Sequence, residues 1–145
     1  ITLPGIFEVI STEPLVILDG AHNPPGALAA AQTLKSSFTF EGTKALIVGM
    51  TEEKDADWML SNLNASEFDC IFTTEASSPR SMSSEELAKI ASKYCSKTIV
   101  CPNPEEALKE AIQISSTNGV IFGTGSMYVV GALREANQKF QSERK

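Results

Sequence analysis

The sequence has few aromatic residues and no long hydrophobic segment. Aromatic residues make up 7% of the 145 residues, with a single tryptophan. The longest apolar stretches, residues 14–18 and 44–50, are far shorter than the roughly 20 residues that a membrane-spanning helix requires. No basic segment followed by an apolar one is present at the amino terminus. We therefore expect no membrane association and no signal peptide.

Cysteine is also scarce. Cys70, Cys95 and Cys101 form neither a CxxC motif nor an even-numbered set that would pair into disulfides. This usage favours reduced thiols and a cytoplasmic protein. Cys70 lies in an apolar run, so we expect it in the hydrophobic core.

Positive charge is limited, and it is not clustered. Lys and Arg number 12 against 18 Asp and Glu, a net charge of −6. A protein that binds a nucleic-acid backbone needs a basic stripe, so the sequence predicts no nucleic-acid partner. The hydrophobic content of 42% excludes a disordered chain. The length suits one domain, which we expect to span residues 1–145.

The pattern of apolar residues predicts an α/β fold. Strands are expected at residues 7–10, 15–18, 45–48, 68–73, 98–101 and 119–122. Helices are expected at residues 24–35, 55–63, 83–94, 104–115 and 126–140, with a frayed tail after them. A turn at residues 11–13 is too short for a crossover helix, so the first strand pair should be an antiparallel hairpin. The other strands are separated by helices, which predicts a Rossmann-like, mostly parallel six-stranded sheet with helices on both faces.

Ligands of such sheets bind beyond the carboxyl ends of the strands. Asp19 and His22, the only histidine, follow the second strand. Asp19 is suited to accept hydrogen bonds from ribose hydroxyls, and His22 to donate one to a phosphate. Asn23-Pro24 has a second interpretation, in which Asn23 caps the next helix and Pro24 occupies its first turn.

The segment Gly123-Thr124-Gly125-Ser126 follows the last strand and opens the last helix. Backbone N–H groups in such a loop suit an anion. The segment matches neither GxxxxGK[ST] nor GxGxxG, and no Walker A sequence occurs elsewhere. The alternative interpretation is a glycine turn with Ser126 as a helix cap.

Lys54 and Arg80 are each expected just before, or in, the first turn of a helix. The helix dipole disfavours a cation there by about 0.3–1 kcal/mol. A negatively charged ligand would offset that cost, and a solvated side chain is the alternative. Asp55 is expected to cap the helix that follows Lys54, or to lie in the first turn of that helix.

Together these residues resemble a known family. The matching strings are Pro4-Gly5-x-Phe7-Glu8-Val9, Leu18-Asp19-Gly20-Ala21-His22-Asn23-Pro24, Lys54-Asp55, Pro79-Arg80 and Gly125-Ser126-Met127-Tyr128-x-x-Gly131-x-x-Arg134. In this order they resemble the C-terminal domain of folylpolyglutamate synthase/dihydrofolate synthase, a branch of the Mur ligases. Met127 stands where the family usually has Leu. Ile6 stands where the family has an Arg that is expected to contact ATP phosphates.

The resemblance implies an ATP-dependent, amide-bond-forming ligase. Such enzymes phosphorylate a substrate carboxylate and then let the amino group of L-glutamate attack the acyl phosphate. The substrates implied are ATP with Mg²⁺, L-glutamate, and dihydropteroate or folates. The P-loop, the Mg²⁺ ligands and most of the folate site belong to an N-terminal domain that this chain lacks. The isolated chain is therefore expected to be inactive.

The resemblance also assigns roles to individual residues. ATP binding is implied for Asp19, His22 and Asn23, glutamate binding for Lys54 and Ser126, and further anion contacts for Arg80 and Gly125. Two other readings stay open. One is the C-terminal domain of another Mur-type amino-acid ligase. The other is a non-catalytic binding module of the same fold, which Ile6 favours.

Overall fold

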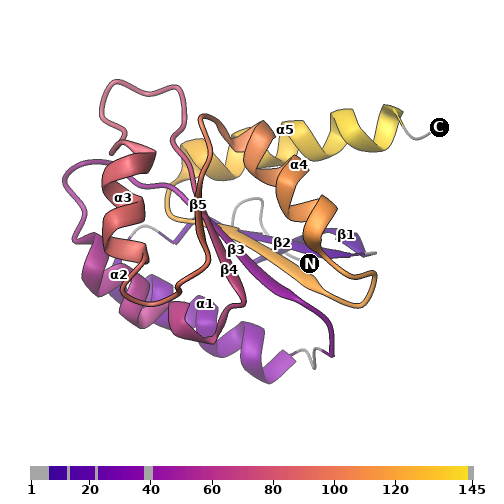
Figure 1. The fold of residues 1–145 in the computed structure, drawn as a ribbon, viewed down its shortest axis with the longest axis horizontal. Coiled ribbons are helices and arrows are strands. Elements are labelled where there is room, and N and C mark those ends of the chain that lie inside the picture. The colour runs from indigo at the N-terminus through magenta and orange to yellow at the C-terminus, as the bar shows by residue number, and fades with distance from the viewer. Residues whose placement is uncertain (1–6, 13, 22, 38–40, 144–145) are drawn as a thin grey trace.

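Six strands form one sheet in the order β1-β2-β6-β3-β4-β5 (Figure 1). The computed structural model describes residues 7–12, 14–21, 23–37 and 41–143. The strands are β1 (Glu8–Thr12), β2 (Leu15–Asp19), β3 (Lys44–Val48), β4 (Cys70–Thr73), β5 (Thr98–Val100) and β6 (Val120–Thr124). β1 pairs with β2 antiparallel, and every other pair is parallel. The mostly parallel sheet and its antiparallel first pair are thus confirmed.

The predicted hairpin turn was placed too early. Ser11 and Thr12 belong to β1 and pair with Val16 and Leu15, so the connection to β2 is shorter than predicted. Ser11 and Thr12 are polar, but polar residues are ordinary on an edge strand. Glu13 lies outside the described residues.

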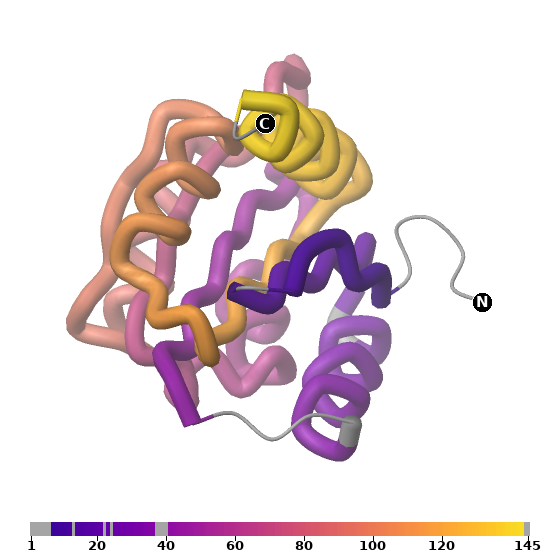
Figure 2. The backbone as a smooth tube through the Cα atoms, turned by 90° about the vertical axis from the view of Figure 1, so that its right-hand side faces the viewer, coloured from indigo at the N-terminus to yellow at the C-terminus, as the bar shows by residue number. Residues whose placement is uncertain are grey.

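Helices cover both faces of the sheet, as predicted. They are α1 (Pro24–Ser37), α2 (Ala56–Asn62), α3 (Ser84–Ala91), α4 (Pro104–Ile114) and α5 (Met127–Glu143). Figure 1 shows α1, α2 and α3 on one face and α4 and α5 on the other, and Figure 2 shows the same two layers from the side.

Each face has its own hydrophobic core. Side chains alternate along a strand, so Leu46 and Val48 of β3 pack toward α1, α2 and α3, whereas Ala45 and Ile47 pack toward α4 and α5. Cys70 is buried in the second core, as the sequence predicted. No helix among residues 7–12, 14–21, 23–37 and 41–143 has the length and apolar character that a membrane span requires.

Several element ends differ from the prediction. A 3₁₀ turn, η1 (Ala65–Glu67), precedes β4, which therefore begins at Cys70 and not at residue 68. α5 continues to Glu143, although a frayed tail was expected after residue 140. Phe140 packs against the second core, which holds the last turns of this helix in place.

The strand order determines where a ligand site can form. β6 is inserted between β2 and β3, although it comes last along the chain. The chain leaves β2 and β3 for helices on one face and leaves β6 for α5 on the other face. Adjacent strands whose following loops diverge to opposite faces leave a crevice at their carboxyl ends. The crevice lies where β2, β6 and β3 end.

Candidate functional site

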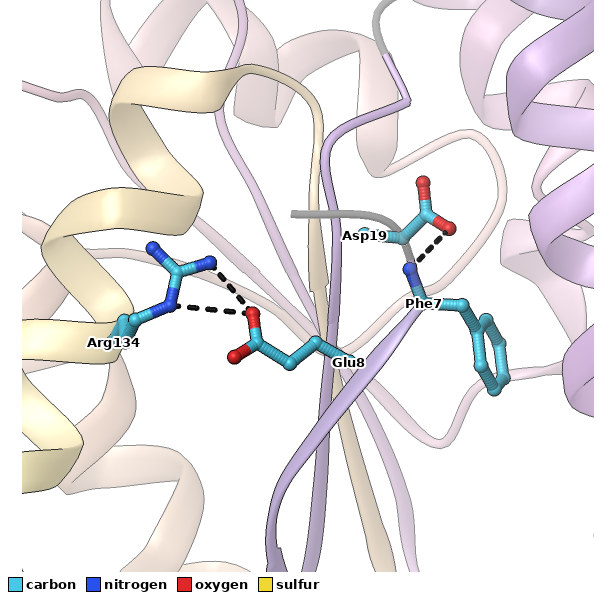
Figure 3. A network of polar contacts seen from close by, with 4 residues as sticks. All are labelled: Phe7, Glu8, Asp19 and Arg134. Atoms are coloured by element: carbon cyan, nitrogen blue, oxygen red, sulfur yellow. Dashed lines mark hydrogen bonds and ion pairs between the residues drawn. The ribbon is translucent and has the colours of Figure 1, made fainter. Parts of the chain in front are cut away.

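Asp19, the last residue of β2, lies at this crevice with its carboxylate oriented by backbone groups. Oδ2 accepts a hydrogen bond from the N–H of Phe7 at 3.0 Å (Figure 3), and Oδ1 accepts one from the N–H of Ala21 at 2.9 Å. Partial burial raises the pKa of Asp19, and the two N–H donors act in the opposite direction. A carboxylate has about four acceptor positions, so Asp19 retains capacity for a ligand hydroxyl.

The loop from β6 to α5 passes very close to the loop after β3. Gly125 has a φ of +117°, and a Cβ there would lie 2.0 Å from the carbonyl oxygen of Gly49. A Cβ on Gly49 would in turn lie 2.6 Å from the carbonyl oxygen of Thr74. Both positions therefore require glycine. The sequence pointed to Gly125 but assigned no role to Gly49, whose requirement arises only from this long-range approach.

Ser126 caps α5. Its Oγ accepts a hydrogen bond from the N–H of Val129 at 3.2 Å, which confirms the capping interpretation. The Ser126 hydroxyl can still donate its own proton, and the amino terminus of a helix favours a negatively charged ligand. Ser126 therefore serves the fold and remains chemically suited to a carboxylate.

Thr124 is a site feature that the sequence did not reveal. It pairs in register with Asp19 across β2 and β6, so both side chains lie on the same face of the sheet. Thr124 is fully buried, and its hydroxyl has no hydrogen-bond partner in the described part of the chain. No local pattern distinguishes such a threonine from an ordinary strand residue.

Lys54 lies where the sequence placed it, directly before α2. Asp55 caps this helix by accepting a hydrogen bond from the N–H of Trp58 at 3.0 Å, as predicted. The Lys54 side chain is half-buried. Because β3 lies next to β6, Lys54 follows the strand beside the one that leads to Ser126.

Arg80 lies before a helix, which is one of the two positions that the sequence predicted. α3 is capped by Ser83, so Arg80 lies in the preceding loop rather than in the first turn. The loop after β4 is bound to the loop after β3, because Arg80 O accepts the N–H of Glu52 at 2.7 Å. Arg80 Nη2 lies 3.2 Å from Glu53 Oε1. The Arg80 side chain is 72% exposed and its charge is already paired, so it is less available to a ligand than Lys54.

Asn23 begins α1. Its Oδ1 accepts a hydrogen bond from the N–H of Gly26 at 2.8 Å, which confirms the helix-capping interpretation. A direct contact between Asn23 and a nucleotide stays a prediction. His22 and Ile6, which bear on the nucleotide prediction, lie outside the described residues.

A carboxylate, a lysine and a helix amino terminus thus follow three adjacent strands. This arrangement is suited to a ligand that carries both hydroxyl groups and negative charge. Within the described residues, no group of three His, Cys, Asp or Glu side chains is positioned to hold a metal ion.

Comparison with known proteins identifies the family. The model of the Mur ligase glutamate ligase domain matches residues 7–127. This chain belongs to that family.

Folate-related ligases are among the proteins to which this chain is similar. The dihydrofolate synthase/folylpolyglutamate synthase of Mycobacterium tuberculosis is 32% identical over 92% of this chain and 30% of its own length. The structure of Mycobacterium tuberculosis folylpolyglutamate synthase complexed with ADP and AMPPCP superposes with a TM-score of 0.81 and 31% identity, over 94% of this chain and 33% of that one. The structure of a bifunctional folylpolyglutamate synthase/dihydrofolate synthase with Mn, AMPPNP and L-glutamate bound superposes with a TM-score of 0.78 and 28% identity, over 97% of this chain and 32% of that one. This chain therefore spans about a third of the length of these relatives.

Proposed function

We propose that this chain is the glutamate ligase domain of an ATP-dependent enzyme that adds L-glutamate to dihydropteroate, to folates or to both. ATP supplies the phosphoryl group that activates the substrate carboxylate. The observation that carries the proposal is the convergence of Asp19, Ser126 and Lys54 beyond three adjacent strands in a member of this family.

Asp19 is proposed to bind the nucleotide. Its carboxylate is fixed by two backbone N–H groups and keeps free acceptor positions, which suits the paired hydroxyls of a ribose. Support comes from the relatives, whose solved structures include complexes with ADP and AMPPCP. His22 and Asn23 are proposed to lie beside the same nucleotide.

Lys54 and Ser126 are proposed to hold carboxylates of the incoming glutamate. Lys54 brings a positive charge to a helix amino terminus, where an anion offsets the unfavourable dipole interaction. Ser126 offers a hydroxyl at the start of α5. Arg80 and the backbone of Gly125 are proposed as further anion contacts. A relative has been solved with L-glutamate bound.

The remaining parts of the reaction are proposed to come from an N-terminal domain. That domain would supply the P-loop, most of the folate site and the ligands of a divalent cation, which we propose to be Mg²⁺. Folate or dihydropteroate would bind between the two domains, with this domain closing over the cleft. We propose a cytoplasmic location for the enzyme, in keeping with the free thiols of its cysteines.

Ligand titrations followed by amide NMR test these assignments on the chain itself. ADP should shift the amide resonances of Ala21 and Gly125, and L-glutamate those around Lys54 and Ser126. Asp19→Ala should weaken ADP binding and Lys54→Ala should weaken glutamate binding, each by roughly 10–200-fold, as expected for a lost hydrogen bond or ion pair to a charged group. Each variant should leave the other ligand nearly unaffected.

Two matched controls lie at the amino ends of the strands, opposite the carboxyl ends where the candidate site lies. Asp69 also accepts a backbone hydrogen bond, from the N–H of Lys44 at 2.8 Å, but it precedes β4. Lys97 is an exposed lysine that precedes β5. Asp69→Ala and Lys97→Ala should leave both affinities unchanged. Equal losses in the control and site variants, or glutamate binding that is insensitive to Lys54, would overturn the assignment.

A further inference from the structure

Three side chains of helix α5 hydrogen bond to two residues of the edge strand β1: Arg134 to Glu8, and Asn137 and Gln141 to Ile10. Arg134 donates to Glu8 Oε1 from Nε at 3.2 Å and from Nη2 at 2.7 Å (Figure 3). Both side chains are largely buried, with 27% and 24% exposed. One helical turn later, Nδ2 of Asn137 donates to the carbonyl oxygen of Ile10 at 3.1 Å. These contacts join segments more than 120 residues apart in the sequence.

The pairing of β1 with β2 is irregular, so contacts from α5 contribute to holding β1 in place. It lies at the edge of the sheet, and its register with β2 shifts between Val9 and Ser11. The intervening Ile10 has no Cα partner in that register, and its carbonyl is the group that Asn137 binds. A bulged edge strand is held less firmly by the ladder than a central strand. The contacts from α5 therefore add to the pairing with β2 in holding β1 in place.

The start of β1 bears directly on the candidate site. Phe7, next to Glu8, has a φ of +43°, and its ring lies 6.2 Å from the ring of Phe122, measured between centroids. Its N–H is one of the two donors that fix Asp19. In Figure 3 the Glu8 side chain points toward Arg134, and Phe7 meets Asp19 on the other side of the strand.

We propose that Arg134 is a positioning residue for Asp19, acting through Glu8 and the N–H of Phe7. This inference rests on the proposed function, because it is toward a nucleotide that Asp19 would be aimed. Arg134 fixes the side chain of Glu8, which fixes the start of β1. Phe7 comes directly before Glu8, and its N–H then holds one carboxylate oxygen of Asp19. α5 also carries Ser126 at its amino terminus, so one helix supports both proposed subsites.

Amide hydrogen exchange of the chain tests the positioning step without any ligand. Arg134→Ala should accelerate exchange at Phe7 roughly fivefold to fiftyfold, as expected for neighbouring groups coupled in one network, while core amides in β3 and β6 exchange at the wild-type rate. The double variant Glu8→Arg with Arg134→Glu should restore slow exchange at Phe7. If Arg134 merely stabilised the fold, its replacement would accelerate exchange of the core amides as well.

Lys139→Ala is the matched control. Lys139 is on the same helix and its Nζ lies 3.3 Å from Glu105 Oε2, in an ion pair that does not contact β1. This variant should leave exchange at Phe7 unchanged. If Arg134→Ala does not fold, Arg134→Lys and the charge-exchanged double variant give the same comparison, with Lys expected to restore exchange only in part because it lacks the planar fork.

ADP affinity then separates this inference from the proposed function. Arg134→Ala should weaken ADP binding roughly fivefold to fiftyfold, and the same loss should vanish in an Asp19→Ala background, where there is no carboxylate to position. Unchanged Phe7 exchange, or unchanged ADP affinity in a folded Arg134→Ala variant, would overturn the positioning role. An Asp19→Ala variant that keeps the wild-type ADP affinity when the N-terminal domain is present, with Phe7 exchange still dependent on Arg134, would refute the nucleotide assignment and support the positioning of Asp19.

Discussion

Two threonines on either side of Val48 offer a sharp test of how the site edge is built. Thr73 of β4 and Thr124 of β6 both pair in register with Val48, so they lie on the same face of the sheet. Both are fully buried. The hydroxyl of Thr73 donates to the carbonyl oxygen of Ser84 at 2.8 Å, whereas the hydroxyl of Thr124 has no partner in the described structure. Replacement by valine removes the hydroxyl and keeps the shape in both cases.

The two substitutions should change stability in opposite directions. A buried hydroxyl without a partner costs about 1–3 kcal/mol, so Thr124→Val should stabilise the chain by about that amount. Thr73→Val loses a hydrogen bond with a net worth of about 0.5–1.5 kcal/mol and should destabilise the chain by a similar amount. For a domain of this size each kcal/mol moves the melting temperature by roughly 4 °C.

Thermal melting and urea unfolding of the two variants check this expectation. The melting temperature should rise in Thr124→Val and fall in Thr73→Val, with the urea dependence of the unfolding free energy unchanged. A fall in Thr124→Val as large as that in Thr73→Val would mean that the Thr124 hydroxyl is satisfied in solution, and the reasoning from its burial would fail.

Four further predictions concern the rest of the molecule. Gly125→Ala should destabilise the chain by about 3 kcal/mol or more in urea unfolding, because its Cβ would meet Gly49 O at 2.0 Å in a backbone conformation that alanine disfavours; a loss below about 1 kcal/mol would contradict that geometry. Lys54→Ala should leave the melting temperature unchanged or slightly higher, because it removes a cation from a helix amino terminus; a drop of many degrees would make Lys54 a structural residue. Burial and the hydrogen bond to Glu110 raise the pKa of the Cys101 thiol from 9.0 to about 12. The unfolded chain therefore releases this proton at a lower pH than the folded chain. The contribution of the Cys101 thiol to the free energy of unfolding is fully present below pH 9 and should be lost as the pH rises toward 12. Unfolding measured across this pH range should show a shallower loss in Cys101→Ala, and an identical slope would refute the assignment. The chain alone should hydrolyse no ATP in the presence of glutamate, because it contains no Walker A sequence; turnover well above a blank would contradict this.

Local sequence was sufficient for features that depend on neighbouring residues. Apolar runs marked the strands, and the caps Asn23, Asp55 and Ser126 marked three helix starts, because a capping hydrogen bond spans only about three residues. The short connection between β1 and β2 required an antiparallel pair. The same reasoning located Asp19 and Lys54 at the carboxyl edge of the sheet, because the last residue of a parallel strand and the loop after it lie there.

Tertiary structure alone decided which of those strand ends are neighbours. Nothing in the local pattern places β6 between β2 and β3. That position depends on a reversal of the strand order after β5, where the chain crosses back over the sheet through α4. The reversal sets Thr124 beside Asp19 and presses Gly125 against Gly49. It also brings α5 to β1, where Arg134 meets Glu8 from 126 residues away. Such contacts form between surfaces that exist only after the sheet has assembled. No local or periodic pattern in the sequence therefore predicts them.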